Sequence, residues 1–256
     1  MSLETQIANL VAATNQLTGE VSGKMAAINQ TVDAKKADLD AWRGGHLSEH
    51  PALAVNFNAS MLTLSGAAPQ QVPVGMGLNA GGNFWDKFDM NIINVASGAA
   101  PESRPAVVRE LLQYMGCDRQ HFSMHFNIVE LTVKSLAGGI NSYVFFIPYR
   151  HVKLGAFHSV TMYHKVVGQG NWGWMDNAKK NVWNQVTHHG LSYGDAGGYF
   201  HVDVGVDNPA VGDKLYLALP QVVLGKWNPE QRAPQMLNVY DMILDAVPTG
   251  SPTSQL

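Results

Sequence analysis

Residues 3–42 read LETQIANLVAATNQLTGEVSGKMAAINQTVDAKKADLDAW and place apolar side chains on one narrow face of a helix. The apolar positions alternate between steps of three and four, with an average near 3.5, which is the repeat of a coiled coil. A helix with so narrow a stripe is stable only beside copies of itself or a partner. The predicted seam consists of Leu3, Ile7, Leu10, Leu17, Val21, Met25, Ile28, Val32, Leu39 and Trp42, and only Thr14 and Lys35 interrupt it.

The heptad register changes once along this seam. Its first half places Ile7, Thr14 and Val21 at a and leucine at d, which favours a dimer. Between Leu17 and Ile28 three steps span eleven residues, and such a stutter locally unwinds the supercoil. Ile28 then falls at d, which favours a larger number of strands. The heptad pattern therefore leaves dimer and trimer open.

Local signals bound the predicted helix. Ser2 is a suitable N-cap, and the pair Gly44-Gly45 is a suitable stop, so that we expect roughly 40 residues, or about 60 Å of helix. Gly19 and Gly23 each cost about 1 kcal/mol relative to alanine. The order of this helix must therefore come from association. The alternative is a single amphipathic helix packed on the rest of the chain.

Composition excludes several classes of protein. Charged residues make up 14% of the 256 residues and the formal net charge is -3, which gives no electrostatic basis for binding nucleic acid or an anionic membrane. Asparagine and glutamine number 31, which predicts a polar surface with few charges. Cys117 is the only cysteine, so an intrachain disulfide and a C-x-x-C metal site are excluded. The sequence predicts neither a secretory signal nor a membrane span.

Beyond residue 43 the pattern is typical of short strands separated by glycine-rich turns. We expect one internal helix, from Ser103 to Met115, with Pro105 in its first turn and Gly116 as its stop. The predicted fold class is mainly β with an N-terminal α-helical coiled coil, and the head is an antiparallel β-sandwich or barrel. The predicted strands are Ala54–Asn58, Met61–Leu64, Ile92–Val95, Phe122–Ile128, Tyr143–Ile147, Ala156–Val167, Gly198–Val206 and Lys214–Val223.

Four domains follow from this pattern. Residues 1–43 form the coiled-coil stalk, and residues 44–101 form either a loop-rich collar or the first part of the head. Residues 102–247 form the β-rich head, and residues 248–256 form a polar, mobile tail.

Catalytic and metal-binding motifs are weak. The chain has no G-x-S-x-G elbow and no H-E-x-x-H sequence, and no cofactor is predicted. His201 and Asp203 lie at i and i+2 of a predicted strand and are the weak candidates for a metal site, although a polar sheet face explains them as well. His188-His189 is predicted to lie in a turn before Gly190. Paired carboxylates for glycoside cleavage can lie far apart in sequence, so a glycan-degrading activity stays open as the alternative to a non-enzymatic protein.

The segment from Gly170 to Asn177 combines aromatic and amide side chains in one predicted loop. Aromatic faces stack on sugar rings while amides bind hydroxyl groups, so this composition suits a carbohydrate ligand. The same tryptophans could equally belong to the core or to a subunit interface. The candidate glycan-binding residues are Asn171, Trp172, Trp174, Asp176, Asn177, Trp183, Tyr193 and Tyr199.

Two groups of residues carry a resemblance to a known family. The opening Met1–Ile7, continued by Leu17-Thr18-x-x-Val21-x-Gly23-Lys24, resembles the start of bacteriophage tail fibre proteins. The runs Gln120-His-Phe-Ser-x-x-Phe126-Asn-Ile128 and Phe157-His-Ser-x-Thr-Met-Tyr-His164 are similar to phrases of the same family. The resemblance extends over about a third of the chain. No binding residue of that family is fixed by a motif, so none is carried over.

The resemblance implies a homotrimeric virion fibre that is assembled in the host cytoplasm. Its N-terminal coiled coil would contact other virion tail proteins, and its β-rich head would bind a bacterial surface glycan or an outer-membrane receptor. The chain lacks the shaft repeats of long fibres, so a short receptor-binding fibre is expected. A polysaccharide-degrading fibre and a structural tail or baseplate component are the alternatives.

Overall fold

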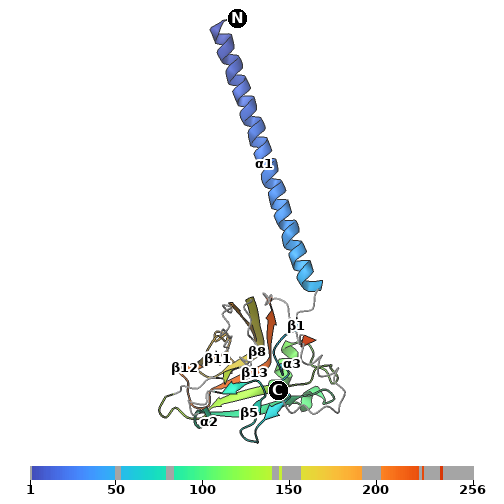
Figure 1. Ribbon diagram of the computed structural model, residues 1–256, viewed down its shortest axis with the longest axis vertical. Helices are drawn as coiled ribbons and strands as arrows, with labels where there is room; N and C mark the ends of the chain where they lie inside the picture. The colour runs from blue at the N-terminus through green and yellow to red at the C-terminus, as the bar shows by residue number, and fades with distance from the viewer. Residues whose placement is uncertain are drawn as a thin grey trace, which may run out of the picture. The chain divides into compact units, whose positions relative to one another are not determined.

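The computed structural model describes residues 2–49, 53–78, 84–139, 144–145, 157–191, 203–224, 227 and 237–238. The chain divides into two compact units, Met1–Pro51 and Ala52–Leu256 (Figure 1). The first unit is helical, and the second is mainly β with antiparallel sheets, as the sequence predicts. The tail predicted at residues 248–256 lies outside the described residues.

Helix α1 spans Leu3–Glu49 and is 47 residues long, or about 70 Å. The Ser2 hydroxyl accepts a hydrogen bond from the Thr5 amide, so the predicted N-cap is confirmed. The predicted stop at Gly44-Gly45 is wrong, because α1 continues through both glycines. Glycine disfavours a helix by about 1 kcal/mol without forbidding it. No helix among the described residues is long and apolar enough to cross a membrane.

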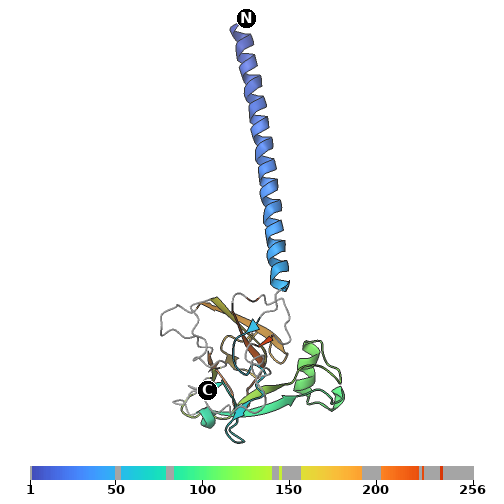
Figure 2. The same cartoon turned by 45° about the vertical axis from the view of Figure 1, so that its right-hand side comes forward.

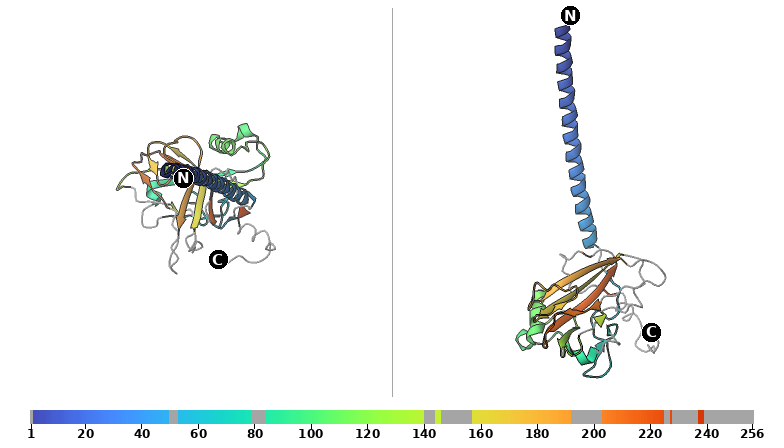
Figure 3. Two further views of the ribbon diagram at one scale, coloured as in Figure 1. Left: turned by 90° about the horizontal axis from the view of Figure 1, so that it is seen from above. Right: turned by 90° about the vertical axis from the view of Figure 1, so that its left-hand side faces the viewer.

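The second unit is built on a seven-stranded sheet. Its path runs β10-β8-β13-β1-β14, while β6 also pairs with β13 and β5 pairs with β6. Figure 3 shows the long strands β10, β8 and β13 side by side. All pairings are antiparallel except β1 with β14. The strands are β1 (Leu53–Ala54), β5 (Phe88–Val95), β6 (Phe126–Val133), β8 (Phe157–Val167), β10 (Asn184–Leu191), β13 (Lys214–Leu224) and β14 (Leu237–Asn238).

Three small sheets accompany the large one, with the orders β11-β7-β4, β12-β9 and β2-β3. The segment predicted as a collar or as the first part of the head supplies β1 and β5 to the large sheet. A sandwich or barrel arrangement of these sheets stays a prediction. The remaining elements are β2 (Leu64–Ser65), β3 (Val72–Pro73), β4 (Gly77–Leu78), α2 (Phe84–Lys87), the 3-10 helix η1 (Pro101–Ser103), α3 (Ala106–Tyr114), β7 (Val144–Phe145), β9 (Asn171–Trp172), β11 (Asp203–Val204) and β12 (Val206–Asp207).

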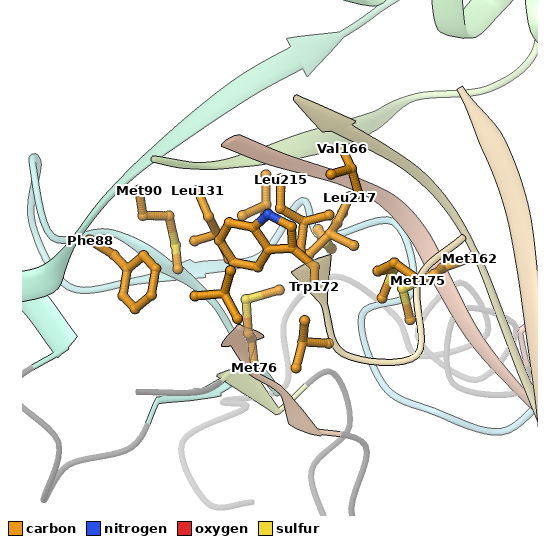
Figure 4. Packing of buried hydrophobic residues seen from close by; sticks show 14 of the residues in the cluster. Met76, Phe88, Met90, Leu131, Met162, Val166, Trp172, Met175, Leu215 and Leu217 are labelled. Carbon is orange, nitrogen blue, oxygen red and sulfur yellow. The ribbon is translucent and has the colours of Figure 1, made fainter. Parts of the chain in front are cut away.

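The large sheet buries apolar side chains on both faces. Successive residues of a strand point to opposite faces. On β13, Leu215 and Leu217 therefore join one hydrophobic cluster, while Tyr216 and Ala218 join another. The first cluster is centred on Trp172 (Figure 4), and the second contains the buried face of α3.

The predicted internal helix is confirmed as α3, although it begins after η1 and is shorter than expected. Its residues Val108, Leu111 and Leu112 are buried against the sheet, and Gly116 follows with a φ of 74°. Figure 2 shows α3 in the connection between β5 and β6. Arg104 fixes the start of this connection, because its buried guanidinium lies 2.9 Å from Asp118 and also donates to main-chain carbonyls.

Strand β13 is irregular at its middle, where the sheet divides. Before this point β13 pairs with β6, and after it β13 pairs with β1. The register shifts between Ala218 and Gln221, and buried Leu219 has a φ of 50°. A left-handed conformation is strained for a bulky residue. The side chain of Asn56 supports the bulge, since its Nδ2 donates to the Pro220 carbonyl and its Oδ1 accepts from the Val222 amide.

Several strand predictions need correction. Strands β8 and β13 are confirmed, but the predicted strands at 54–58 and 61–64 shrink to β1 and β2, with a turn between them. The alternation that begins at Phe122 becomes a strand only at Phe126. The turn predicted at His188-His189 is wrong, because both residues lie in β10 and pair with β8. Of the strands predicted at 143–147 and 198–206, residues 143, 146–147 and 198–202 lie outside the described residues.

Replacing Asn56 tests the support of this bulge. Asn56→Ala leaves two buried main-chain groups without their partner, and each costs about 1–3 kcal/mol. We expect the free energy of unfolding to fall by about 3 kcal/mol in urea denaturation at one fixed protein concentration. Asn91→Ala, at an exposed position of β5, is the control and should change stability by less than about 0.5 kcal/mol. Equal stability of the two variants would contradict this role of Asn56.

Candidate interaction surfaces

The apolar row of α1 is exposed along its whole length. The exposed fraction of its large side chains runs from 49% at Val21 to 72% at Leu3. Every side chain from Ser2 to Trp42 is exposed, so no residue of the helical unit covers the row. Val11, at an e position, is 53% exposed and widens the apolar surface of the first half. An exposed apolar surface of this extent marks an interaction surface.

The two polar residues of the predicted seam are satisfied within their own helix. The Thr14 hydroxyl donates to the Leu10 carbonyl at 2.8 Å. The Lys35 ammonium lies 3.1 Å from the Asp38 carboxylate, one turn further along. Gly19 and Gly23 have no neighbouring atom within 4 Å of where a Cβ would lie. Neither polar residue therefore depends on a partner across the seam.

The segment 170–177 places its first tryptophan in the core. Trp172 is 1% exposed and is surrounded by Phe88, Met90, Leu215 and Leu217 of the first cluster (Figure 4). A ring that is buried in this way presents no face to a sugar. The assignment of Trp172 to a glycan site is therefore corrected, and the alternative of core packing holds for this residue.

Trp183 is also a core residue. It is 3% exposed in the second cluster, and its indole Nε1 donates to the Val107 carbonyl of α3 at 3.0 Å. Its assignment to a glycan site is corrected for the same reason. Both tryptophans lie in segments where apolar and polar residues alternate. This pattern alone does not tell which residues point into the core and which point to solvent.

Asn177 organises the loop that follows β9. Its Oδ1 accepts from the Trp172 amide, and its Nδ2 donates to the carbonyls of Trp172 and Met175. Its amide is therefore engaged within the loop. Asp176 forms an ion pair with Lys179 at 3.2 Å.

Trp174 and Asn171 keep the surface positions that a ligand needs. The Trp174 ring is half-buried, and its centroid lies 5.7 Å from that of exposed His188. Asn171 is exposed on β9. Tyr193 and Tyr199 lie outside the described residues. Trp174 is thus the aromatic residue of the described candidate set that a ligand can reach.

His164 of β8 lies beneath this loop. It has no exposed surface, and its Nε2 accepts a hydrogen bond from the Asp176 amide at 3.1 Å. Burial lowers the pKa of His164 from the ordinary 6.5 to about 4, although the Asp176 carboxylate opposes this shift. Sequence reasoning missed His164 because its position in an alternating strand gives no signal of a hydrogen bond to a distant loop.

Asp213, the residue before β13, is a buried acceptor. Its carboxylate accepts hydrogen bonds from the amides of Gln169, Gly170 and Ala210. A Cβ at Gly168, where φ is 98°, would lie 2.0 Å from an Asp213 oxygen. The turn before β9 and the turn between β12 and β13 are thus held together by one carboxylate.

Glu110 of α3 and Glu130 of β6 are each paired with a lysine. Glu110 binds Lys165, and Glu130 lies 3.2 Å from Lys214. Burial and the neighbouring Glu130, which accepts a hydrogen bond from Tyr216, raise the pKa of the Tyr216 hydroxyl. These contacts give the two glutamates structural roles. The absence of glycan-degrading activity stays a prediction.

The predicted metal site is not formed by the described residues. His201 lies outside them, and Asp203 is exposed on β11. Among the residues that the structure describes, no group of three histidine, cysteine or acidic side chains could hold a metal ion.

Comparison with known proteins gives little information about this chain. No family model matches the sequence, and no curated protein matches it. A solved structure, the tripod (BppUct-A-L) from the baseplate of bacteriophage Tuc2009, is similar with a TM-score of 0.31 and 12% identity. The match covers 75% of this chain and spans 60% of that chain. A similarity this low carries no argument about fold or role.

Asn177 and Asn171 form a matched pair for testing the loop. Asn177→Ala removes three hydrogen bonds to main-chain groups, so we expect the free energy of unfolding to fall by about 2 kcal/mol. Asn171→Ala removes an exposed amide, and we expect a change below about 0.5 kcal/mol. Urea denaturation followed by tryptophan fluorescence measures both. If Asn171→Ala is the more destabilising change, the assignment of Asn177 as the loop anchor is wrong.

Proposed function

We propose that this chain is the protomer of a short homotrimeric attachment fibre of a bacteriophage virion. The observation that carries the proposal is the apolar row of α1, which stays exposed in the single chain. Burying a leucine or isoleucine side chain stabilises by about 1.5–3 kcal/mol, so association of several copies through this row is strongly favourable. The resemblance of the N-terminal residues to tail fibre proteins supplies the biological setting.

The trimer has a physical reason in this setting. Three heads on one stalk convert weak individual contacts into firm attachment, because binding by the first head raises the effective concentration of the others. The N-terminal region joins other virion tail proteins, and the head binds a glycan or a protein of the bacterial surface. Attachment by this means needs no catalytic step.

Within the head, we assign glycan contact to the loop that carries Trp174. Trp174 is partly exposed beside His188, and Asn171 and Asp176 lie in the same segment. An aromatic face with nearby polar groups suits the alternating apolar and hydroxyl surfaces of a sugar.

A charge in the seam tests the assembly. Ile28→Asp puts three carboxylates into one layer of the trimer, so α1 should lose its helicity and its concentration-dependent melting, measured by circular dichroism at 222 nm. Gln30→Asp, at an outer position of the same turn, is the control and should melt like the unchanged protein. Indistinguishable melting of the two variants would contradict association through this row.

Replacing Trp174 tests the glycan contact. Trp174→Ala should weaken the affinity of each head for host surface polysaccharide about tenfold, because a stacked aromatic pair contributes about 0.5–1.5 kcal/mol beyond the area that it buries. Leu136→Ala, which truncates an exposed apolar side chain on another turn, should leave binding unchanged.

The same binding experiment separates the alternative functions. Release of oligosaccharide from the polysaccharide would contradict the non-enzymatic proposal and favour a degrading fibre. Failure of the intact protein to bind host cells, or to block adsorption, would favour a structural tail or baseplate component.

A further inference from the structure

The hydrogen bond between His164 and the Trp174 loop requires a neutral imidazole. Nε2 of His164 faces the Asp176 N–H at 3.1 Å, so this nitrogen must present a lone pair. A protonated imidazole carries hydrogen on both nitrogens and would place N–H against N–H. Since His164 has no exposed surface, water cannot replace the lost partner without opening the loop.

The groups around His164 give little stabilisation to a positive charge on its imidazole. On the neighbouring strands, Leu217 of β13 and Asn184 of β10 lie opposite His164 in the register, and both are uncharged. The loop adds Asp176, which favours the charged imidazole, and Lys179, which disfavours it. Burial outweighs both effects, so the pKa falls to about 4.

This one hydrogen bond lies at the centre of the loop. Met175, the residue before Asp176, is buried in the first cluster together with Met162 and Val166, which flank His164 on β8 (Figure 4). Trp174, the residue before Met175, contacts His188 of β10. Loss of the bond therefore weakens the attachment of the segment that positions the Trp174 ring.

We propose that His164 is a pH-sensitive latch, which holds the Trp174 loop closed on the sheet while it is neutral and releases the loop when it is protonated. The inference rests on the proposed function in one respect, since the latch controls glycan binding only if Trp174 contacts the glycan. The expected effect is loss of the binding surface on acidification.

The sign and size of the effect follow from linkage. The opened loop leaves His164 in water with an ordinary pKa near 6.5, whereas the closed loop holds the pKa at about 4. The open state thus binds more protons between these values, and acidification favours opening. The opening equilibrium should rise about tenfold at pH 5.5 and on the order of 50-fold at pH 4.5, relative to pH 7.5.

Hydrogen exchange of the full chain measures the opening of the loop directly. The exchange rate of each peptide is divided by its intrinsic rate at the same pH. Protection of the segment 173–178 should fall by these factors, while that of β5 stays constant. His164→Gln offers an amide oxygen that accepts at every pH, so its loop should lose the pH dependence. His188→Gln, which removes the exposed imidazole beside Trp174, should behave like the unchanged protein.

Protection of the loop that does not vary with pH in the unchanged protein would overturn the latch, and this result needs no variant to fold. The same would follow if His164→Gln folds and keeps the full pH dependence. Glycan binding measured at pH 7.5 and pH 5 separates the two proposals. A loop that opens without any effect on binding supports the latch and contradicts the role of Trp174.

Discussion

The apolar row on α1 is the constraint on which the rest of the structure depends. A helix of 47 residues keeps its side chains from Ser2 to Trp42 in water, and ten of its seam positions are apolar. Helices of this kind gain most of their stability from packing of the apolar face. Within the helical unit no residue covers that face. The proposed association of copies through this row accounts for both the length of the helix and its exposure.

The second unit contains long connections between its strands. The main chain of these connections needs hydrogen bonds that regular secondary structure does not supply. Asparagine side chains make many of the hydrogen bonds that fix these connections. Asn56 supports the bulge of β13, and Asn177 closes the loop after β9. Asn58 likewise bonds the main chain of Thr63 and Val74. The composition predicted a polar surface from these amides, whereas many of them replace missing main-chain partners inside the fold.

Strong periodicity decided which elements the sequence could predict. β8 and β13 are eleven-residue runs rich in apolar side chains and were identified correctly, as was α3 with its proline and glycine boundaries. β10 was missed because NQVTHHGL carries polar side chains on both faces. Its position is set by pairing with β8, which local sequence does not encode.

The candidate site shows the same limit. Trp172, Trp174 and Trp183 lie close in sequence, yet only Trp174 keeps an accessible ring, because the burial of the others depends on residues far along the chain. The hydrogen bond of His164 to Asp176 also joins a strand to a separate loop. Composition can thus select a region for a ligand, but tertiary packing decides which residues reach it.

The mass of the intact protein in solution tests the central claim most directly. Sedimentation equilibrium of the full chain at micromolar concentration measures this mass without reference to shape. Association of α1 into a three-stranded coil predicts three times 27.8 kDa, and this mass should persist on dilution through the micromolar range. A mass of 27.8 kDa would contradict the account, because the apolar row would then remain in water with nothing to cover it.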